Sequence, residues 1–163
     1  MIETRLDKNF KIKGFFDEET STISYVVYDM TSKKCAVIDS VLDFDFSSGT
    51  IDYHNAEKII SFIEKMKLDL EWLIETHVHA DHLSASPYIQ KKLGGKIGIS
   101  EKISDIQNIF GKTFNAGTEF QRDGSQFDRL FKDNDEYKIG SIKCVVINTP
   151  GHTPACTAPV SYT

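Results

Sequence analysis

Residues 70–82 read LEWLIETHVHADH, and this stretch decides both the fold class and the chemistry. Its first half is an apolar run that is typical of a buried strand. Its second half places three imidazoles and a carboxylate, those of His77, His79, Asp81 and His82, within six positions. A sheet fixes the backbone where a strand ends, so side chains there can be held as a metal ion requires. The stretch predicts a metal site at a sheet edge; histidines that merely close a loop are the simpler alternative.

Strand and helix patterns alternate around this stretch. Residues 23–29 and 35–39 are rich in β-branched and aromatic side chains and flank a polar turn, which predicts a hairpin. Apolar residues then recur at helical spacing up to Met66, in a helix that Asn55 is expected to cap. Further helices are predicted at 86–93 and 101–110, strands at 96–99, 137–139 and 142–147, and loops at 40–53 and 111–126. The pattern predicts a mixed α/β protein.

A second polar motif follows the last predicted strand, where residues 148–154 read NTPGHTP. Pro150 and Gly151 predict a tight turn that needs the backbone freedom of glycine and that presents His152 after a strand. Four of the five histidines then lie at strand ends. The fifth, His54, lies beside a helix start and is expected to be a solvated surface residue.

Composition argues against several classes of function. With 163 residues and 40% hydrophobic side chains, the chain suits one globular domain. A formal charge of −5 and scattered basic residues argue against binding to nucleic acid or an anionic membrane surface. No stretch approaches the ~20 apolar residues of a membrane span, and we expect a cytoplasmic protein. Cys35, Cys144 and Cys156 are too widely spaced to indicate a disulfide framework or a cysteine-rich zinc module.

The pattern His77-x-His79-x-Asp81-His82, followed by TPGHT at residues 149–153, resembles the metallo-β-lactamase superfamily. The segments HADHL and TPAC make the likeness closer to persulfide dioxygenases and the related β-lactamase-hydrolase-like proteins. The resemblance covers nearly the whole chain. It implies an αββα sandwich, with two facing sheets, helices outside and a metal at one edge. Residues 1–163 are then expected to form a single such domain, its N-terminal two-thirds.

The resemblance also implies a reaction, in which one Fe(II) per chain and O₂ oxidise a thiol persulfide such as glutathione persulfide to sulfite and the thiol. Carried over, His77 and His152 are iron ligands; His79, Asp81 and His82 surround the iron in persulfide dioxygenases and are direct ligands in dinuclear zinc relatives. We therefore assign His77, His79 and His152 to metal binding and Asp81 and His82 to catalysis. Two histidines and a carboxylate leave open positions at which O₂ and a substrate sulfur can bind.

The sequence departs from the family pattern after Cys156. The family's third iron ligand is an Asp beyond the second motif, whereas here only eleven residues follow His152 and none is acidic. Residues 157–163 read TAPVSYT where the family continues into a strand, and Pro159 is expected to fit a strand badly. This implies a truncated copy with an incomplete metal site and little persulfide oxidation. Its unpaired sheet edge would favour a homodimer.

Two other functions stay open. A thioester hydrolase resembling glyoxalase II would hold two metal ions, such as Zn, and would use all four histidines and Asp81. A chain without a catalytic role, either a remnant or a metal- or thiol-binding module, is the third hypothesis, and the missing carboxylate favours it. Cys156 would then be a candidate thiol sensor, although a buried structural cysteine is the commoner outcome.

Overall fold

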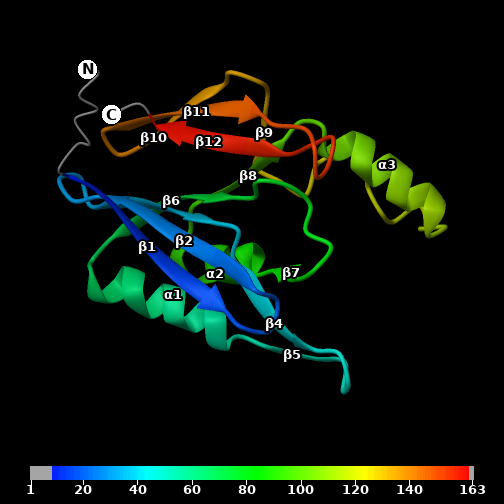
Figure 1. Cartoon of the computed structure of the whole chain (residues 1–163), viewed down its shortest axis with the longest axis horizontal. Helices are drawn as coiled ribbons and strands as arrows, with labels where there is room; N and C mark the ends of the chain where they lie inside the picture. Colours follow the sequence, from blue (N-terminus) through cyan, green and yellow to red (C-terminus); the bar gives the residue numbers. More distant parts are fainter. Residues whose placement is uncertain (1–8, 162–163) are drawn as a thin grey trace.

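The structure, a computed structural model, describes residues 9–161 as twelve strands and three helices (Figure 1). The helices are α1 (His54–Lys65), α2 (Ser86–Leu93) and α3 (Ile103–Thr113). The strands are β1 (Phe10–Asp17), β2 (Thr22–Asp29), β3 (Lys34–Ile38), β4 (Val41–Asp45), β5 (Thr50–Asp52), β6 (Asp69–Ile74), β7 (Leu83–Ser84), β8 (Lys96–Ser100), β9 (Arg129–Phe131), β10 (Glu136–Ile139), β11 (Ile142–Asn148) and β12 (Thr157–Ser161).

Three layers build the molecule. The central layer is a six-stranded sheet in the order β1-β2-β3-β6-β8-β9. In Figure 1, α1 and α2 lie on one side of it and the sheet β10-β11-β12 lies on the other, while the small sheet β5-β4-β7 extends at one end. The two facing sheets and one helical layer agree with the predicted sandwich; no helix within residues 9–161 covers the outer face of β10–β12. Among these residues, no helix is long and apolar enough to span a membrane.

The central strands are apolar on both faces because each face packs against a different layer. Val26 and Leu73 belong to the core that the sheet shares with α1 and α2. Their neighbours Val27 and Ile74 belong to the core between the two sheets. The ring nitrogen of Trp72 adds a polar link, since Nε1 donates to the Lys138 carbonyl at 3.0 Å across that interface.

Strand ends from both sheets meet at one edge. β3 and β6 are parallel neighbours, so the residues that follow them come out at the same side. β11 and β12 are antiparallel, and the loop of residues 149–156 joins them. Thr157, the first residue of β12, donates to the Thr76 carbonyl from its backbone N–H at 2.8 Å and from its hydroxyl at 3.1 Å. These two bonds hold the 149–156 loop against the end of β6.

Most predicted elements are present, including the β2–β3 hairpin, β6, all three helices and the β10–β11 hairpin. Three local predictions are wrong. Residues 40–53 contain β4 and β5 in place of a continuous loop. Asn55 does not cap α1, because its amide donates to the carboxylates of Asp17 and Asp43. Pro159 lies within β12, opposite Val146, since β12 is an outer strand of its sheet, where a missing N–H is tolerated.

Asp29, which is 0% exposed, joins the two sheets at the opposite end of the molecule from the histidines' strand ends. Its carboxylate accepts from Thr31 N (2.8 Å) and Ser32 Oγ (2.8 Å) in its own turn, and from Ser141 N (3.0 Å) and Ser141 Oγ (2.6 Å) in the β10–β11 turn. Burial alone would raise the pKa of Asp29, but these hydrogen bonds hold it well below the usual range. Gly140 permits the approach, because it has a φ of 60° and a Cβ there would meet Ser32 Oγ at 1.9 Å.

We expect Asp29→Asn to lower the free energy of unfolding by about 2 kcal/mol, because charge-assisted hydrogen bonds to a buried group are lost and the NH₂ group of the new amide must face at least one donor. Urea unfolding at neutral pH measures this. The matched control is Asp105→Asn in the first turn of α3, an exposed position whose loss should stay below about 1 kcal/mol.

Wild type and Asp29→Asn also test how the stability of the fold depends on pH. A carboxylate whose pKa is lowered on folding stabilises the fold above its unfolded pKa of about 3.9, and the stabilisation is lost as the pH falls below that value. The stability difference between wild type and Asp29→Asn should therefore shrink in acid. An equal difference at neutral pH and at about pH 2 would contradict this account of Asp29.

Candidate metal centre

The site residues predicted from the sequence gather where β6 and β11 end. The ring centroids of His77 and His152 lie 4.8 Å apart, those of His77 and His79 4.1 Å, and those of His79 and His82 4.2 Å. His54 is exposed at the start of α1. The expected convergence of His77 with His152 is confirmed, whereas the role of each residue stays a prediction.

Three groups of side chains bring potential ligand atoms within 4.8 Å of one another. They are His77, His152 and Cys156; Asp39, His77 and His79; and His79, Asp81 and His82. Among the residues that the structure describes, the predicted set of His77, His79 and His152 is not one of these groups but is divided between two. His77 therefore belongs to two of these groups, one with His152 and Cys156 and the other with Asp39 and His79.

Thr76 holds His77 in one tautomer. The Thr76 hydroxyl donates its only proton to Asp39 at 2.7 Å, so it accepts from Nδ1 of His77 at 2.9 Å. The lone pair of His77 is therefore on Nε2. Burial and the nearby His79 lower the pKa of His77. The imidazole is neutral at neutral pH and can bind a cation.

His79 lies between two acidic side chains. Its Nε2 is 3.1 Å from Asp39 Oδ1 and 3.3 Å from Glu75 Oε2. Burial favours the neutral ring, but the contacts with Asp39 and Glu75 outweigh it and raise the pKa of His79 to about 10. Glu75 is itself buried, and it accepts from the hydroxyls of Ser84 and Ser86 at 2.5 Å each. A metal ion at His79 would have to use Nδ1 and displace a proton.

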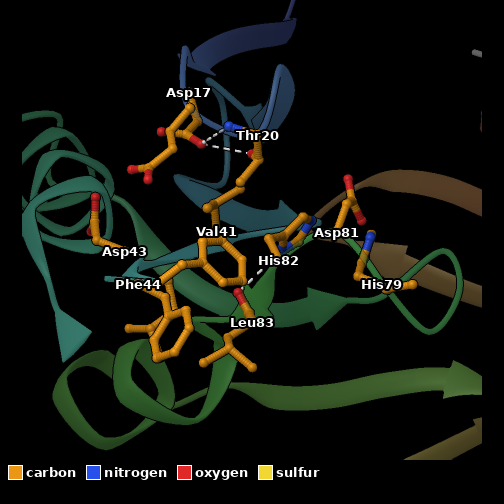
Figure 2. A pocket seen from close by; sticks show the side chains of 13 residues that line it. Asp17, Thr20, Val41, Asp43, Phe44, His79, Asp81, His82 and Leu83 are labelled. Carbon is orange, nitrogen blue, oxygen red and sulfur yellow. Dashed lines mark hydrogen bonds between the residues drawn. The ribbon is translucent and has the colours of Figure 1, made fainter. Parts of the chain in front are cut away.

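One nitrogen of His82 is buried without a partner. Its Nδ1 donates to the Leu83 carbonyl at 3.0 Å, which leaves the lone pair on Nε2. Nε2 has no hydrogen-bond partner among the described residues, and the whole residue is 9% exposed. Figure 2 shows His79, Asp81 and His82 together at the wall of a cavity of about 200 Å³. A buried acceptor without a partner costs free energy, so the arrangement fits a metal ion here.

Sequence reasoning missed Asp39, on which the site depends. This residue ends β3 with a φ of 50°, which aspartate tolerates better than most residues. It accepts from Thr76 N at 2.8 Å as well as from the Thr76 hydroxyl and His79. Burial would raise the pKa of Asp39, but these bonds lower it. A signal existed, because two strands joined by a helix are expected to be parallel, with both carboxyl ends at one edge.

The loop that carries His152 is closed by its own hydrogen bonds. Thr149 N donates to the Cys156 carbonyl at 2.9 Å, and Gly151 N donates to the Thr153 carbonyl at 3.3 Å. The prediction that this turn needs glycine is wrong, because Gly151 has no positive φ and a Cβ there would meet nothing within 4 Å. Closure of the loop, rather than glycine, presents His152.

Two further cavities open beside the histidines and are large enough for a small molecule. One of about 390 Å³ is lined by Thr22, Ile23, Asp39, His77, His79, Ala80, Asp81 and His152. The other, of about 310 Å³, adds an apolar wall from Pro87, Ile97, Ile99 and Phe127 to His77, His79 and His82. A ligand in the first of these cavities can therefore reach the rings of both His77 and His152.

Comparison with protein-family models matches residues 18–159 to the family described as the metallo-beta-lactamase superfamily. The match includes every residue of the three ligand groups.

Curated relatives support the same grouping. A probable metallo-hydrolase of Burkholderia pseudomallei is 49% identical over 145 residues, which make up 89% of this chain and 49% of that protein. Glyoxylase B2 of Dictyostelium discoideum is 42% identical over 153 residues, or 93% of this chain and 51% of that protein. The chain therefore spans about half the length of these relatives.

Among solved structures, ETHE1 from Myxococcus xanthus matches with a TM-score of 0.68 and 22% identity, over 93% of this chain and 53% of that chain. Likeness at this level of identity shows the fold alone. The fold is that of the metallo-β-lactamases, as predicted from the sequence.

We expect Asp39→Ala to weaken zinc binding by the chain about 10- to 100-fold, because it removes the carboxylate that orients His79 and, through Thr76, His77. Competition titration against a chromophoric chelator measures the affinity. Asp52→Ala, an exposed change on β5, is the matched control and should leave affinity unchanged. Equal affinities for a folded Asp39→Ala and wild type would contradict this role.

Proposed function

The chain belongs to the metallo-β-lactamase superfamily, and on this basis we propose that it is a metal-dependent enzyme that acts on a small thiol derivative. The reaction proposed is oxidation of a persulfide such as glutathione persulfide. One O₂ and one water convert the terminal sulfur to sulfite, the thiol is released, and two protons are lost. The observation that carries the proposal is the convergence of His77 and His152 beside a cavity of about 390 Å³.

The residues of the chain would divide the work as follows. His77, through Nε2, and His152 would hold one iron from two facing loops. Fe(II) in that place would supply the redox chemistry with O₂. Asp39 keeps the Thr76–His77 pair oriented. Asp81 is exposed at the cavity wall, where its carboxylate, bonded to the Thr22 hydroxyl at 3.4 Å, can pass released protons to water.

The motif supports persulfide as the substrate through the resemblance of HADHL and TPAC to persulfide dioxygenases. The geometry supports a single metal position, since Nε2 of His79 is in contact with the carboxylates of Asp39 and Glu75 and is not open to an ion. A ring fixed in this way positions its neighbours whether or not it binds metal itself.

A second candidate function is hydrolysis of a thioester, for which the group His79, Asp81 and His82 is the specific observation. The unpartnered Nε2 of His82 could bind a second ion there. Two metal ions together activate water for attack on a carbonyl carbon. The relative named Glyoxylase B2 is consistent with this reading.

The sequence alone predicted little persulfide oxidation, but the convergence of His77 and His152 leads us to expect that the iron-loaded chain consumes O₂ and forms sulfite from glutathione persulfide. His77→Ala and His152→Ala should each lower kcat/KM about 100-fold or more, because each removes a ligand. Oxygen uptake and sulfite release are measured together. His54→Ala, at an exposed position on α1, is the matched control and should retain wild-type turnover.

Metal analysis of the same samples separates the two candidates. The first predicts one iron per chain. Two metal ions per chain, with hydrolysis of a glutathione thioester and no oxygen uptake, would replace it with the second candidate. Oxygen uptake that survives His77→Ala would remove the proposed site from the reaction.

A further inference from the structure

Cys156 lies beside the two histidines that the proposed function uses. Its Sγ and one ring nitrogen each of His77 and His152 are all within 4.8 Å of one another. The thiol is half-buried, in contrast to Cys35 and Cys144, which are buried in the two cores. Burial raises the pKa of the Cys35 thiol to about 12 and also raises that of Cys144. Of the three thiols, only that of Cys156 is placed to meet an ion.

The backbone fixes this placement. Thr157, next to Cys156, is bonded to the carbonyl of Thr76, next to His77, by both its N–H and its hydroxyl. The bond from Thr149 N to the Cys156 carbonyl closes the loop that carries His152. The three side chains therefore come from backbone segments that hydrogen bonds hold together, and their convergence does not depend on a flexible side chain alone.

Donors converge on the sulfur. The Thr153 N–H donates to Sγ at 3.1 Å, and the Thr153 hydroxyl lies 3.1 Å from the same sulfur. Donors of this kind stabilise a thiolate and accompany metal-bound sulfur in proteins. Thr153 thus contacts the sulfur of Cys156 in the way that Thr76 contacts His77, and such contacts hold a metal ligand in position.

We propose that Cys156 is a metal ligand, so that His77, His152 and Cys156 hold one first-row metal ion through two nitrogens and one sulfur. The inference rests on the proposed function, which places the ion on His77 and His152, and it supplies the third ligand.

The distances suit an ion of the size of zinc. Bonds of about 2.0–2.1 Å to nitrogen and about 2.3 Å to sulfur place tetrahedral ligand atoms about 3.5 Å apart. Ligand atoms within 4.8 Å reach that spacing by drawing together about 1 Å. A sulfur donor also changes the preference of the site toward softer ions such as Zn(II) and Co(II) over Mg(II) and Mn(II).

Cobalt substitution tests the ligand directly, because Co(II) bound to a thiolate has a sulfur-to-metal charge-transfer band in the near ultraviolet. We expect the band when Co(II) alone is added to the 163-residue chain. Cys156→Ser should abolish it and weaken Zn(II) binding about tenfold or more. Cys144→Ala, which removes a core thiol away from the site, should retain both the band and the affinity.

Cys156→Asp shows whether metal binding is lost because the ligand is removed or because the chain misfolds, since a carboxylate can replace the thiolate as a ligand. This variant should bind Zn(II) and Co(II) without the charge-transfer band. Co(II) that binds to wild type with no such band, or a band that survives Cys156→Ser, would overturn the inference and leave the iron proposal standing. A chain that binds no Co(II), Zn(II) or Fe(II) at all would overturn both.

Discussion

Hydrogen bonds between Thr157 and the Thr76 carbonyl join the two halves of the site. β6 belongs to the central sheet and β12 to the facing sheet, and the core between these layers is largely apolar, apart from links such as the Trp72–Lys138 bond. Apolar packing is non-directional and does not fix the distance between two loops. Two bonds to a single oxygen do so. The spacing of His77 and His152 therefore follows from this contact more than from the sandwich itself.

Buried acids set the state of the histidines. Glu75 is buried and Asp39 is half-buried, and a carboxylate withdrawn from water is tolerated only when donors surround it. Thr76, Ser84 and Ser86 provide some of those donors, and His79 provides the cation. The same Thr76 hydroxyl accepts from Nδ1 of His77 and so leaves the lone pair of that ring on Nε2. The hydrogen-bond network around Asp39 and Glu75 is thus also the network that orients the candidate ligands His77 and His79.

The sequence was informative where a pattern is local. Helical spacing located α1, α2 and α3, and the expectation that His77 and His152 bind one ion correctly placed the two rings close together, although their strands β6 and β11 belong to different sheets. The errors came from tertiary contacts. Asn55 donates hydrogen bonds to Asp17 and Asp43 instead of capping α1, and Pro159 is tolerated because its strand, β12, is an outer strand of its sheet. The role of Asp39 was missed because it depends on the pairing of β3 with β6, and no short sequence motif indicates that pairing.

The order in which ions would occupy the site follows from these contacts. The contacts of His79 Nε2 with Asp39 and Glu75 raise the pKa of the ring, so Nδ1 also carries a proton, and an ion at Nδ1 must displace that second proton. His77 has a lowered pKa, and its Nε2 has no hydrogen-bond partner among residues 9–161, so an ion there has little to displace. The first ion should therefore go to the side of His77, His152 and Cys156, and a second to His79, Asp81 and His82 only where metal outcompetes the proton.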